Sequence, residues 1–510
     1  MNTIRAEAPA SGKGPIASDP NLVWHYDSDA APDHECELLV IGAGPAGIAA
    51  ATQAAQLGID TLLLDEQVAP GGQIYRSITA TPVVQRQILG EDYWHGAPLV
   101  DAFQRSSARY QAGATVWAIV PKTPDRQQYE VAFSIAGKAQ RLHARHILLA
   151  TGAHERPFPV PGWTLPGVMT AGAAQILLKS AAAVPGGHTI LAGCGPLLYL
   201  IAWQYLNAGV KIDALLDTTP KGRMRAALPH AWGFLRSPYL NKGLRLLRTV
   251  KSAIPIVKRV SLLEALGENK IESLRYAADG VAHTIKADHL LLHQGVVPNI
   301  NLSSALGIEH DWNNAMACWE PRVDGWGATM LRGIGVAGDG AGIAGALAAE
   351  YRGRIAALQV AMALGRIDMH ERDRLAVPHQ RALARAVQGR AFFDALYMAP
   401  VGFRRPRGEV IVCRCEEITA RQVRETVALG CQGPNQMKAF LRCGMGPCQG
   451  RFCSLTVTEL IADERGCDPS EIGSYRIRFP TKPVTVGELA SLPQTEASQR
   501  AVIRFKSSNG

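Results

Sequence analysis

The stretch Leu38-Leu-Val-Ile-Gly42-Ala-Gly44-Pro45-Ala46-Gly47-Ile-Ala-Ala50 decides the fold of this chain. Its four leading apolar residues predict a buried parallel strand, and the alanine-rich run after the glycines predicts a helix. The glycines between them have the spacing G-x-G-x-x-G. Gly42 permits a tight turn, Gly44 lets a pyrophosphate approach the backbone, and Gly47 lets the helix pack close to the strand. The first helical turn, which includes Pro45 and Ala46, would offer free N–H groups and partial positive charge to phosphates.

A second apolar strand, Thr61-Leu-Leu-Leu, ends in Asp65-Glu66. In a dinucleotide-binding unit, a carboxylate at this place accepts hydrogen bonds from the ribose hydroxyls. Asp65 is the ribose candidate because it directly follows the strand, and Glu66 is the alternative. Together the two strands and the glycines predict a dinucleotide site rather than a chance glycine-rich turn.

Three later segments have residue types that suit a flavin. Gly72 allows close backbone approach, and the amide of Gln73 suits a flavin ring edge, although a plain turn is the alternative. The strand 144–150 runs into the small turn Thr151-Gly152. Asp339 follows Gly338 at a strand end, before a helix expected over 343–364. It could bind a ribityl chain, with a simple N-cap as the alternative.

A second nucleotide-binding unit is predicted at Thr189-Ile-Leu-Ala-Gly193-Cys-Gly195-Pro-Leu-Leu198. Gly193 and Gly195 are in place, but Leu198 stands where a third small residue belongs. The next strand ends at Asp217, at the right distance for a ribose carboxylate. This site could hold an adenine nucleotide, and we expect NADH and NADPH to be poor reductants because of Leu198.

The 510 residues predict two to four domains, and the 47% apolar and 19% charged content is typical of a globular enzyme. The net charge of +9 comes from scattered basic residues, which argues against a nucleic-acid partner. We find no run of about 20 apolar residues that would span a membrane and no signal-peptide pattern, so the expected location is cytoplasmic. Seven of the ten cysteines lie between Cys413 and Cys467, which favours metal binding over disulfides.

The cysteine module reads Cys413-Arg-Cys415, then Cys443-Gly-Met-Gly-Pro-Cys448-Gln-Gly-Arg-Phe-Cys453. Two thiolates on a loop and further cysteines after a helix can surround a small iron–sulfur cluster. Zinc is the alternative for four cysteines, although the spacing is not that of a zinc finger. Five cysteines compete for four places.

The order G-A-G-P-A-G, G-G-Q-I-Y-R, A-T-G-A-H-E-R-P, L-L-L-H-Q-G-V-V-P-N and A-G-D-G-A-G-I resembles the two-dinucleotide-domain flavoproteins. The resemblance is strongest to the large (alpha) subunits of opine oxidases, hydrogen cyanide synthase and multimeric proline or hydroxyproline dehydrogenases, over about residues 35–465. It implies an α/β fold with FAD in the first domain. It also implies a small helical domain similar to bacterioferritin-associated ferredoxin, with a 2Fe–2S cluster on Cys413, Cys415, Cys448 and Cys453, and with Cys443 as the alternate ligand.

We therefore expect a loose N-terminal arm, two parts of an FAD-binding domain around a second nucleotide-binding domain, a helical linker, an iron–sulfur domain and a tail. Their expected bounds are 1–34, 35–155, 156–298, 299–365, 366–410, 411–470 and 471–510. The linker, with its aromatic residues and arginines, should lie against the body or a partner subunit.

The resemblance implies an electron-transfer subunit of a heteromeric dehydrogenase that acts on the C–N bond of an opine, proline, hydroxyproline or similar amino acid. A smaller amine-oxidase-like flavoprotein would be the partner, with room for FMN at the subunit interface. The residues themselves show no acid–base group for substrate chemistry, since His154 and His293 suit structural hydrogen bonds. One rival is a pyridine-nucleotide disulfide reductase, which needs a redox-active cysteine pair beside the flavin, usually C-x-x-C or a near variant. No C-x-x-C occurs in this chain, and its first 400 residues offer only Cys36, Cys194 and Cys318. The other is a non-catalytic electron-transfer or iron-handling protein.

Overall fold

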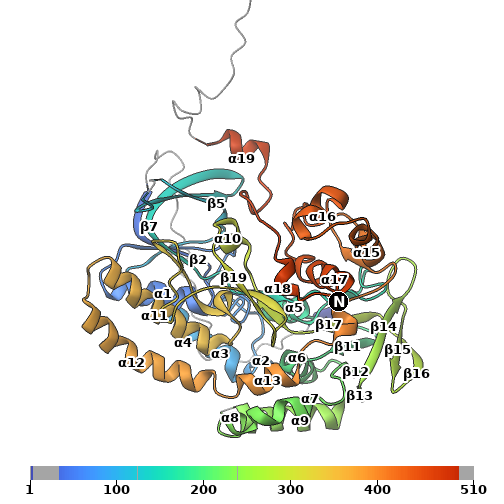
Figure 1. Ribbon diagram of the computed structural model, residues 1–510. Helices are drawn as coiled ribbons and strands as arrows, with labels where there is room; N and C mark the ends of the chain where they lie inside the picture. The colour runs from blue at the N-terminus through green and yellow to red at the C-terminus, as the bar shows by residue number, and fades with distance from the viewer. Residues whose placement is uncertain (1, 4–33, 123–124, 238, 493–510) are drawn as a thin grey trace, which may run out of the picture.

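The computed structural model describes residues 2–3, 34–122, 125–237 and 239–492 (Figure 1). Most of the expected N-terminal arm and the end of the expected C-terminal tail lie outside these ranges. The predicted α/β class is confirmed, with two large sheets in the body, several smaller ones, and a small helical domain beside them.

The first sheet is built around the strand that begins the glycine-rich stretch. Its order is β4-β3-β2-β7-β6-β5, with β21 also paired to β7. β2, β3, β4 and β21 run parallel to their neighbours, whereas β5, β6 and β7 form antiparallel pairs. The bounds are β2 (His34–Ile41), β3 (Thr61–Leu64), β4 (Arg109–Gln111), β5 (Thr115–Pro121), β6 (Tyr129–Ile135), β7 (Lys138–Leu149) and β21 (Ile334–Val336).

Helices that are far apart in sequence cover this sheet. α1 (Pro45–Gln56) packs against α11 (Ala346–Ala363), which packs against α12 (Met369–Ala386), so the return segment closes the domain (Figure 1). Short helices lie between β3 and β4: α2 (Arg86–Leu89), α3 (Glu91–Trp94) and α4 (Gly96–Gln104). The helix expected from residue 343 begins only at Ala346. A 3-10 turn, η3 (Gly338–Ala341), and Gly342 and Gly345 at positive φ occupy the intervening chain.

The second sheet has the order β13-β12-β11-β17-β9, and every pair in it is parallel. A three-stranded antiparallel sheet, β14-β15-β16, follows β13 in sequence. The strands are β9 (Val168–Thr170), β11 (Thr189–Gly193), β12 (Ala214–Asp217), β13 (Ile256–Lys258), β14 (Val260–Leu266), β15 (Ser273–Ala278), β16 (Val281–Lys286) and β17 (His289–His293). The helices are α5 (Ala171–Ala181), α6 (Pro196–Asn207), α7 (Arg223–Ala227), η2 (Leu228–His230), α8 (Ala231–Leu235) and α9 (Tyr239–Ala253).

Short strands join the two parts of the body. β8 (Ala153–Glu155) pairs with β18 (Val296–Pro298). The segment that leaves the first domain and the segment that returns to it therefore lie side by side. α10 (Asn301–Ala305) and the hairpin of β19 (His310–Asn313) and β20 (Cys318–Pro321) complete the return segment. A two-stranded pair, β1 (Asn2–Thr3) with β10 (Ala183–Val184), lies at the edge of the second domain.

The linker segment is helical and lies against the body. Beyond α12 it contains α13 (Arg390–Leu396) and α14 (Val401–Arg404). Phe392 stacks on Phe234 at 4.4 Å between ring centroids, and Phe403 meets Phe158 edge-to-face at 5.1 Å. Because Phe392 and Phe403 are buried, these rings are used within the chain rather than offered to a second subunit.

The cysteine-rich segment forms a small domain of short strands and helices. Its elements are β22 (Ile411–Cys413), β23 (Ile418–Thr419), α15 (Ala420–Ala428), α16 (Pro434–Leu441), α17 (Ser454–Arg465) and α18 (Pro469–Ile472). Thr419 caps α15 through a capping box with Gln422.

The chain then returns to the first domain, where α19 (Val486–Ala490) lies near β5 and β7 (Figure 1). The N–H of Thr481 donates to the carbonyl of Trp117 at 2.9 Å, and the Ser491 hydroxyl accepts from the N–H of Ala139 at 2.9 Å. This C-terminal segment therefore ties the cysteine domain to the first sheet.

A buried ion pair connects the linker to the cysteine domain. The Arg404 guanidinium at the end of α14 pairs with the Glu459 carboxylate on α17, and both side chains are buried. Arg404 also donates to the carbonyl of Ala399 at 2.9 Å. Removing one partner of such a pair leaves a charge without compensation, which costs about 3–5 kcal/mol.

We therefore predict that Glu459→Gln strongly destabilises the docking of the cysteine domain, since Arg404 would remain buried and charged. The matched control is Glu425→Gln on α15, whose pair with Arg421 is exposed and contributes about 1 kcal/mol or less. Thermal unfolding should show a clearly earlier first transition for Glu459→Gln alone. Equal shifts in the two variants would contradict this reading.

Candidate functional site

The glycines of the first turn serve two different purposes. Gly42 has a φ of +106°, and a Cβ there would lie 2.5 Å from the carbonyl oxygen of Ala150. A Cβ at Gly47 would lie 1.8 Å from the carbonyl oxygen of Gly42, so the fold itself requires both glycines. Gly44 differs, because a Cβ there would meet nothing closer than the Cα of Gly72 at 4.0 Å. The space above Gly44 is the cradle that a pyrophosphate at the start of α1 requires.

The predicted flavin segments converge on this turn. The N–H of Gly71 donates to the carbonyl of Ala43 at 2.8 Å, which holds the next loop against the first turn. A Cβ at Gly72 would lie 2.7 Å from the Cα of Gly44, and one at Gly338 would lie 2.6 Å from the Cβ of Ala46. The structure therefore brings three of the sequence-predicted segments together around the start of α1.

Thr151 and Gly152 join the same group from the end of β7. A Cβ at Gly340 would lie 3.5 Å from the backbone nitrogen of Gly152. The Thr151 hydroxyl donates to the carbonyl of Asn299 at 3.2 Å, and the N–H of Asn299 donates to the carbonyl of Gly152 at 2.9 Å. These bonds fix the turn where the chain passes from the first domain to the second.

The two ribose candidates have different surroundings. The Asp65 carboxylate is buried and accepts the N–H groups of Ala43, at 2.5 Å, and Gln67, at 2.7 Å. Burial raises the pKa of Asp65, opposed by these two backbone hydrogen bonds. The Glu66 carboxylate instead pairs with Lys482 of the C-terminal segment at 2.6 Å. Asp65 thus stabilises the glycine turn from the end of β3, whereas Glu66 binds the C-terminal segment through Lys482.

Asp339 braces a turn as well. Its Oδ1 accepts the N–H groups of Ala344, at 2.8 Å, and Gly345, at 3.1 Å, immediately before α11. This geometry is close to the N-cap alternative that the sequence leaves open, although α11 begins several residues later than expected. Asp339 still lies in the segment that contacts the start of α1 through Gly338.

Lys179 is a site residue that the motifs do not indicate. Its ammonium group, buried on α5 of the second domain, donates to the carbonyls of Gln73, at 3.3 Å, and Ile74, at 2.9 Å, and to the Gln175 amide oxygen at 2.9 Å. Burial lowers the pKa of Lys179 to about 7. The Gln73 side chain is exposed, so Lys179 fixes the backbone of this loop and leaves the amide free. The sequence carries one signal for this residue, because Gln175 and Lys179 lie four residues apart and so share one face of a mostly apolar helix.

The second nucleotide site has the predicted strand–turn–helix, with Gly193 at the end of β11 and Gly195 before α6. Leu198 is fully buried. The Asp217 carboxylate is already engaged: it accepts the Tyr199 hydroxyl at 2.7 Å and the N–H of Thr219 at 2.8 Å. A ribose at this site would have to compete with Tyr199 for the Asp217 carboxylate. The spacing of the glycines could not indicate this hydrogen bond.

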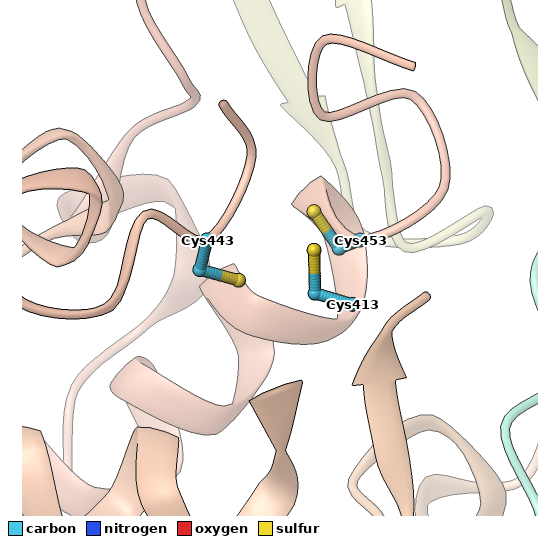
Figure 2. A group of neighbouring side chains, drawn as sticks. All are labelled: Cys413, Cys443 and Cys453. Atoms are coloured by element: carbon cyan, nitrogen blue, oxygen red, sulfur yellow. The ribbon is translucent and has the colours of Figure 1, made fainter. Parts of the chain in front are cut away.

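Three buried cysteines meet in the small domain. The Sγ atoms of Cys413, at the end of β22, Cys443, after α16, and Cys453, before α17, all lie within 4.8 Å of one another. Figure 2 shows the three sulfur atoms pointing into one shared space. Hydrogen bonds from the Cys443 and Cys453 thiols lower the pKa of Cys413, and so do the N–H groups of Gly444 and Glu416. Thiolates that share one metal at about 2.3 Å stand roughly 3.8 Å apart, so this trio suits a metal centre.

Cys415 and Cys448 form a second pair beside the trio. Their side chains contact each other, and the N–H of Cys448 donates to the Cys415 sulfur. A Cβ at Gly446 would lie 2.3 Å from the Cys415 Cβ, so glycine is needed for the loop to pass there. The structure thus groups Cys443, the alternate ligand in the sequence-based set, with Cys413 and Cys453. Cys415 and Cys448 lie together nearer the surface.

One contact joins the cysteine loop to the body. The ring Nε2 of His154, on β8, lies 3.2 Å from the carbonyl oxygen of Arg451, and the ring meets Phe452 edge-to-face at 6.3 Å. Arg451 and Phe452 lie between Cys448 and Cys453, and His154 follows Thr151-Gly152 by two residues. Burial lowers the pKa of His154 to about 4, so the ring is neutral near pH 7. His293 instead bonds to Glu155 at 2.7 Å.

The three cysteines outside the small domain do not form a redox pair in the part of the chain that the structure describes. Cys36 lies on β2, Cys194 follows β11, and Cys318 lies on β20, all as free, buried thiols. Burial raises the pKa of each of these thiols to about 12, which makes them poor nucleophiles. The disulfide reductase alternative therefore gains no support from this site.

Comparison with known proteins identifies the family. The model of the pyridine nucleotide-disulphide oxidoreductases matches residues 36–365, and that of the sarcosine oxidase A3 domain matches residues 408–492. The opine oxidase A subunits of Agrobacterium tumefaciens (strain Ach5) and Rhizobium meliloti are 49% and 47% identical to this chain. Each match covers 91% of this chain, and the two cover 93% and 89% of the relatives' own lengths. The chain belongs to the family of opine oxidase A subunits.

Two further similarities extend the comparison. Hydrogen cyanide synthase subunit HcnB of Pseudomonas aeruginosa (strain PAO1) is 30% identical over 89% of this chain and 98% of its own length. The crystal structure of L-proline dehydrogenase from P. horikoshii superposes with a TM-score of 0.68 over 90% of this chain and 80% of that chain. At 18% identity, this last similarity shows the fold alone.

The family membership and the fold make this chain an FAD-dependent oxidoreductase. Within the described ranges, the helices include none that is long and apolar enough to cross a membrane.

We predict that Gly44→Val abolishes FAD binding while the fold persists. Gly44 has a φ of −77°, and a Cβ there would meet only the Cα of Gly72, at 4.0 Å, so we expect the backbone to accept a side chain that a ligand at the start of α1 would clash with. The purified variant should lack flavin absorbance yet keep the circular dichroism and domain structure of the wild type. The control is Gly325→Val, which also has open space and ordinary backbone geometry and should retain flavin. Full flavin content in Gly44→Val would contradict this placement.

Proposed function

We propose that this chain is the electron-transfer subunit of a heteromeric dehydrogenase that oxidises the C–N bond of an opine, proline, hydroxyproline or similar amino acid. The observation that carries the proposal is the contact between the loop from Cys448 to Cys453 and β8, the strand that follows the flavin segment Thr151-Gly152. His154 lies on β8, two residues beyond Thr151-Gly152. Its ring nitrogen approaches the carbonyl oxygen of Arg451 in the cysteine loop. The names of the relatives support the substrate class, since they are called subunits of opine oxidase and hydrogen cyanide synthase.

In this proposal the first domain holds FAD through the residues that converge on α1. Gly44, with Pro45 and Ala46, would face the pyrophosphate, and Gly42 and Gly47 would shape the turn that holds it. Asp65 would reach the ribose as it braces the turn. Gly72, Gln73, Thr151, Gly152, Gly338 and Asp339 would surround the rest of the cofactor. Bound flavin accepts an electron pair and can release the electrons singly. Lys179 would keep the loop at Gln73 in position from the second domain.

A 2Fe–2S cluster would lie among the five cysteines and would carry single electrons. We propose Cys413 with Cys453 or Cys443 on the buried side, and Cys415 with Cys448 on the outer side. This assignment gives each iron two thiolates and keeps the sequence-based set of four, with Cys443 as the alternate. The N–H groups of Gly444, Glu416 and Cys448 would stabilise the thiolate charge.

The partner would be a smaller amine-oxidase-like flavoprotein that carries out the substrate chemistry, with FMN near the subunit interface. The two histidines beside the flavin segments are engaged in structural hydrogen bonds, His154 with Arg451 and His293 with Glu155, which fits a division of labour between subunits. An adenine nucleotide in the second site would occupy Gly193, Gly195 and Asp217, provided that Tyr199 yields its hydrogen bond.

We predict that the isolated chain does not oxidise amines. Purified alone, it should give no dye reduction with opines, proline, hydroxyproline or glycine, because it lacks the substrate subunit. Co-expression with the partner should produce turnover with at least one of these substrates. Robust amine-dependent dye reduction by the homogeneous single chain would contradict the proposal.

We also predict a paramagnetic signal from a reduced 2Fe–2S cluster, read by electron paramagnetic resonance together with iron analysis. Cys413→Ser, Cys415→Ser and Cys448→Ser should each abolish or strongly shift the signal, because each removes a thiolate ligand. Of Cys443→Ser and Cys453→Ser, one should abolish the signal and the other should leave it. Cys431→Ser is the control, since its thiol donates to the carbonyl of Gly433 away from the group. Stoichiometric zinc without iron would refute the assignment.

A further inference from the structure

One buried hydroxyl group faces the cysteine group from the segment that follows α18. The side chain of Tyr475 is 2% exposed, and its hydroxyl contacts the Cys443 thiol. The structure records no other hydrogen-bond partner for this hydroxyl among the residues that it describes. A neutral thiol is a weak acceptor, and a buried hydroxyl without a good acceptor costs free energy. The position of Tyr475 therefore suits a stronger acceptor, such as a charged sulfur atom.

The ring of Tyr475 fills space that two glycines of the cysteine module leave open. A Cβ at Gly444 would lie 2.7 Å from the ring Cζ, the atom that carries the hydroxyl, and one at Gly450 would lie 2.8 Å from Cδ2. Gly444 directly follows Cys443, and Gly450 lies in the loop before Cys453. The ring is therefore enclosed by the two loops that bring these buried cysteines together.

Hydrogen bonds from α16 fix the backbone on both sides of Tyr475. The Asn435 amide donates to the carbonyl of Ser474 at 3.1 Å and accepts the N–H of Arg476 at 2.7 Å. Lys438, one turn further along α16, donates to the carbonyl of Arg476 at 2.8 Å. Its Nζ also lies 5.1 Å from the centre of the Tyr475 ring, a distance that suits a cation–π contact. These contacts hold the ring and its hydroxyl in one orientation.

We propose that the Tyr475 hydroxyl donates a hydrogen bond to the buried sulfur side of the iron–sulfur centre and raises the reduction potential of that centre. This inference rests on the cluster of the proposed function and adds to it a residue outside the cysteine set. When one electron passes from the flavin to the cluster, the negative charge on its sulfur atoms increases, and the proton stays on the Tyr475 oxygen. A hydrogen bond to these atoms is stronger in the reduced state and therefore favours reduction.

The test compares the full chain with its Tyr475→Phe variant, which keeps the ring between the two glycines and removes only the hydroxyl. The iron content and the paramagnetic signal of the reduced cluster should be retained. A redox titration followed by electron paramagnetic resonance should show a reduction equilibrium about tenfold less favourable in the variant, a shift of about 59 mV to lower potential for one electron. After exchange into D2O, the wild-type cluster should show a hyperfine coupling to a deuteron that the variant lacks.

The matched control is Tyr239→Phe on α9, which removes a hydroxyl that donates to the carbonyl of Ala386 at 3.0 Å, away from the cysteine domain (Figure 1). Its cluster should have the wild-type potential. Equal potentials in Tyr475→Phe and the wild type, both with cluster, overturn this inference and leave the proposed function intact. Loss of the cluster in Tyr475→Phe also overturns it, since the hydroxyl would then serve assembly. A wild-type chain that binds no cluster refutes the proposed function, and this inference with it.

Discussion

The site depends on the close approach of Gly47 to the carbonyl oxygen of Gly42, where a single Cβ would lie 1.8 Å from that oxygen. This approach places α1 directly after β2 and leaves its first N–H groups at the end of the sheet. The carboxylate of Asp65 then holds the N–H of Ala43 from the neighbouring strand. The loop at Gly72 and the return turn at Gly338 can pack here only because side chains are absent. One backbone contact therefore determines where four separate segments meet.

The connection between the two proposed cofactor sites is made by segments distant in sequence. Arg404 and Glu459 anchor the cysteine domain to the linker, Lys482 and Glu66 anchor the C-terminal segment to the first domain, and His154 meets the cysteine loop itself. The buried pair is costly to break, whereas the exposed pair contributes little by itself. Together they hold the cysteine group in a fixed position relative to the glycine turn. Fixed separation is what electron transfer between two centres requires.

Much of this arrangement could be predicted from the sequence because local patterns determine it. The strand at 38–41, the glycine turn, the second nucleotide-binding unit and the capped helix at Thr419 follow from periodicity and residue type. The sequence places the start of α11 too early, since Asp339 and two glycines at positive φ extend the turn. The backbone partners of Lys179 and the partner of Tyr199 could not be predicted, because they lie far away in sequence or depend on how a helix is rotated. The spacing of the five cysteines in the sequence likewise does not indicate which sulfur atoms lie close together.

The central claim is that one chain carries a flavin and an iron–sulfur cluster in electronic contact. Anaerobic titration of the purified chain with a calibrated reductant, followed by absorbance and electron paramagnetic resonance, tests it most directly. The account predicts that this chain takes up one more electron than its flavin alone can accept, and that the extra electron gives the cluster signal. If uptake ends when the flavin is fully reduced and no cluster signal develops, the account is wrong.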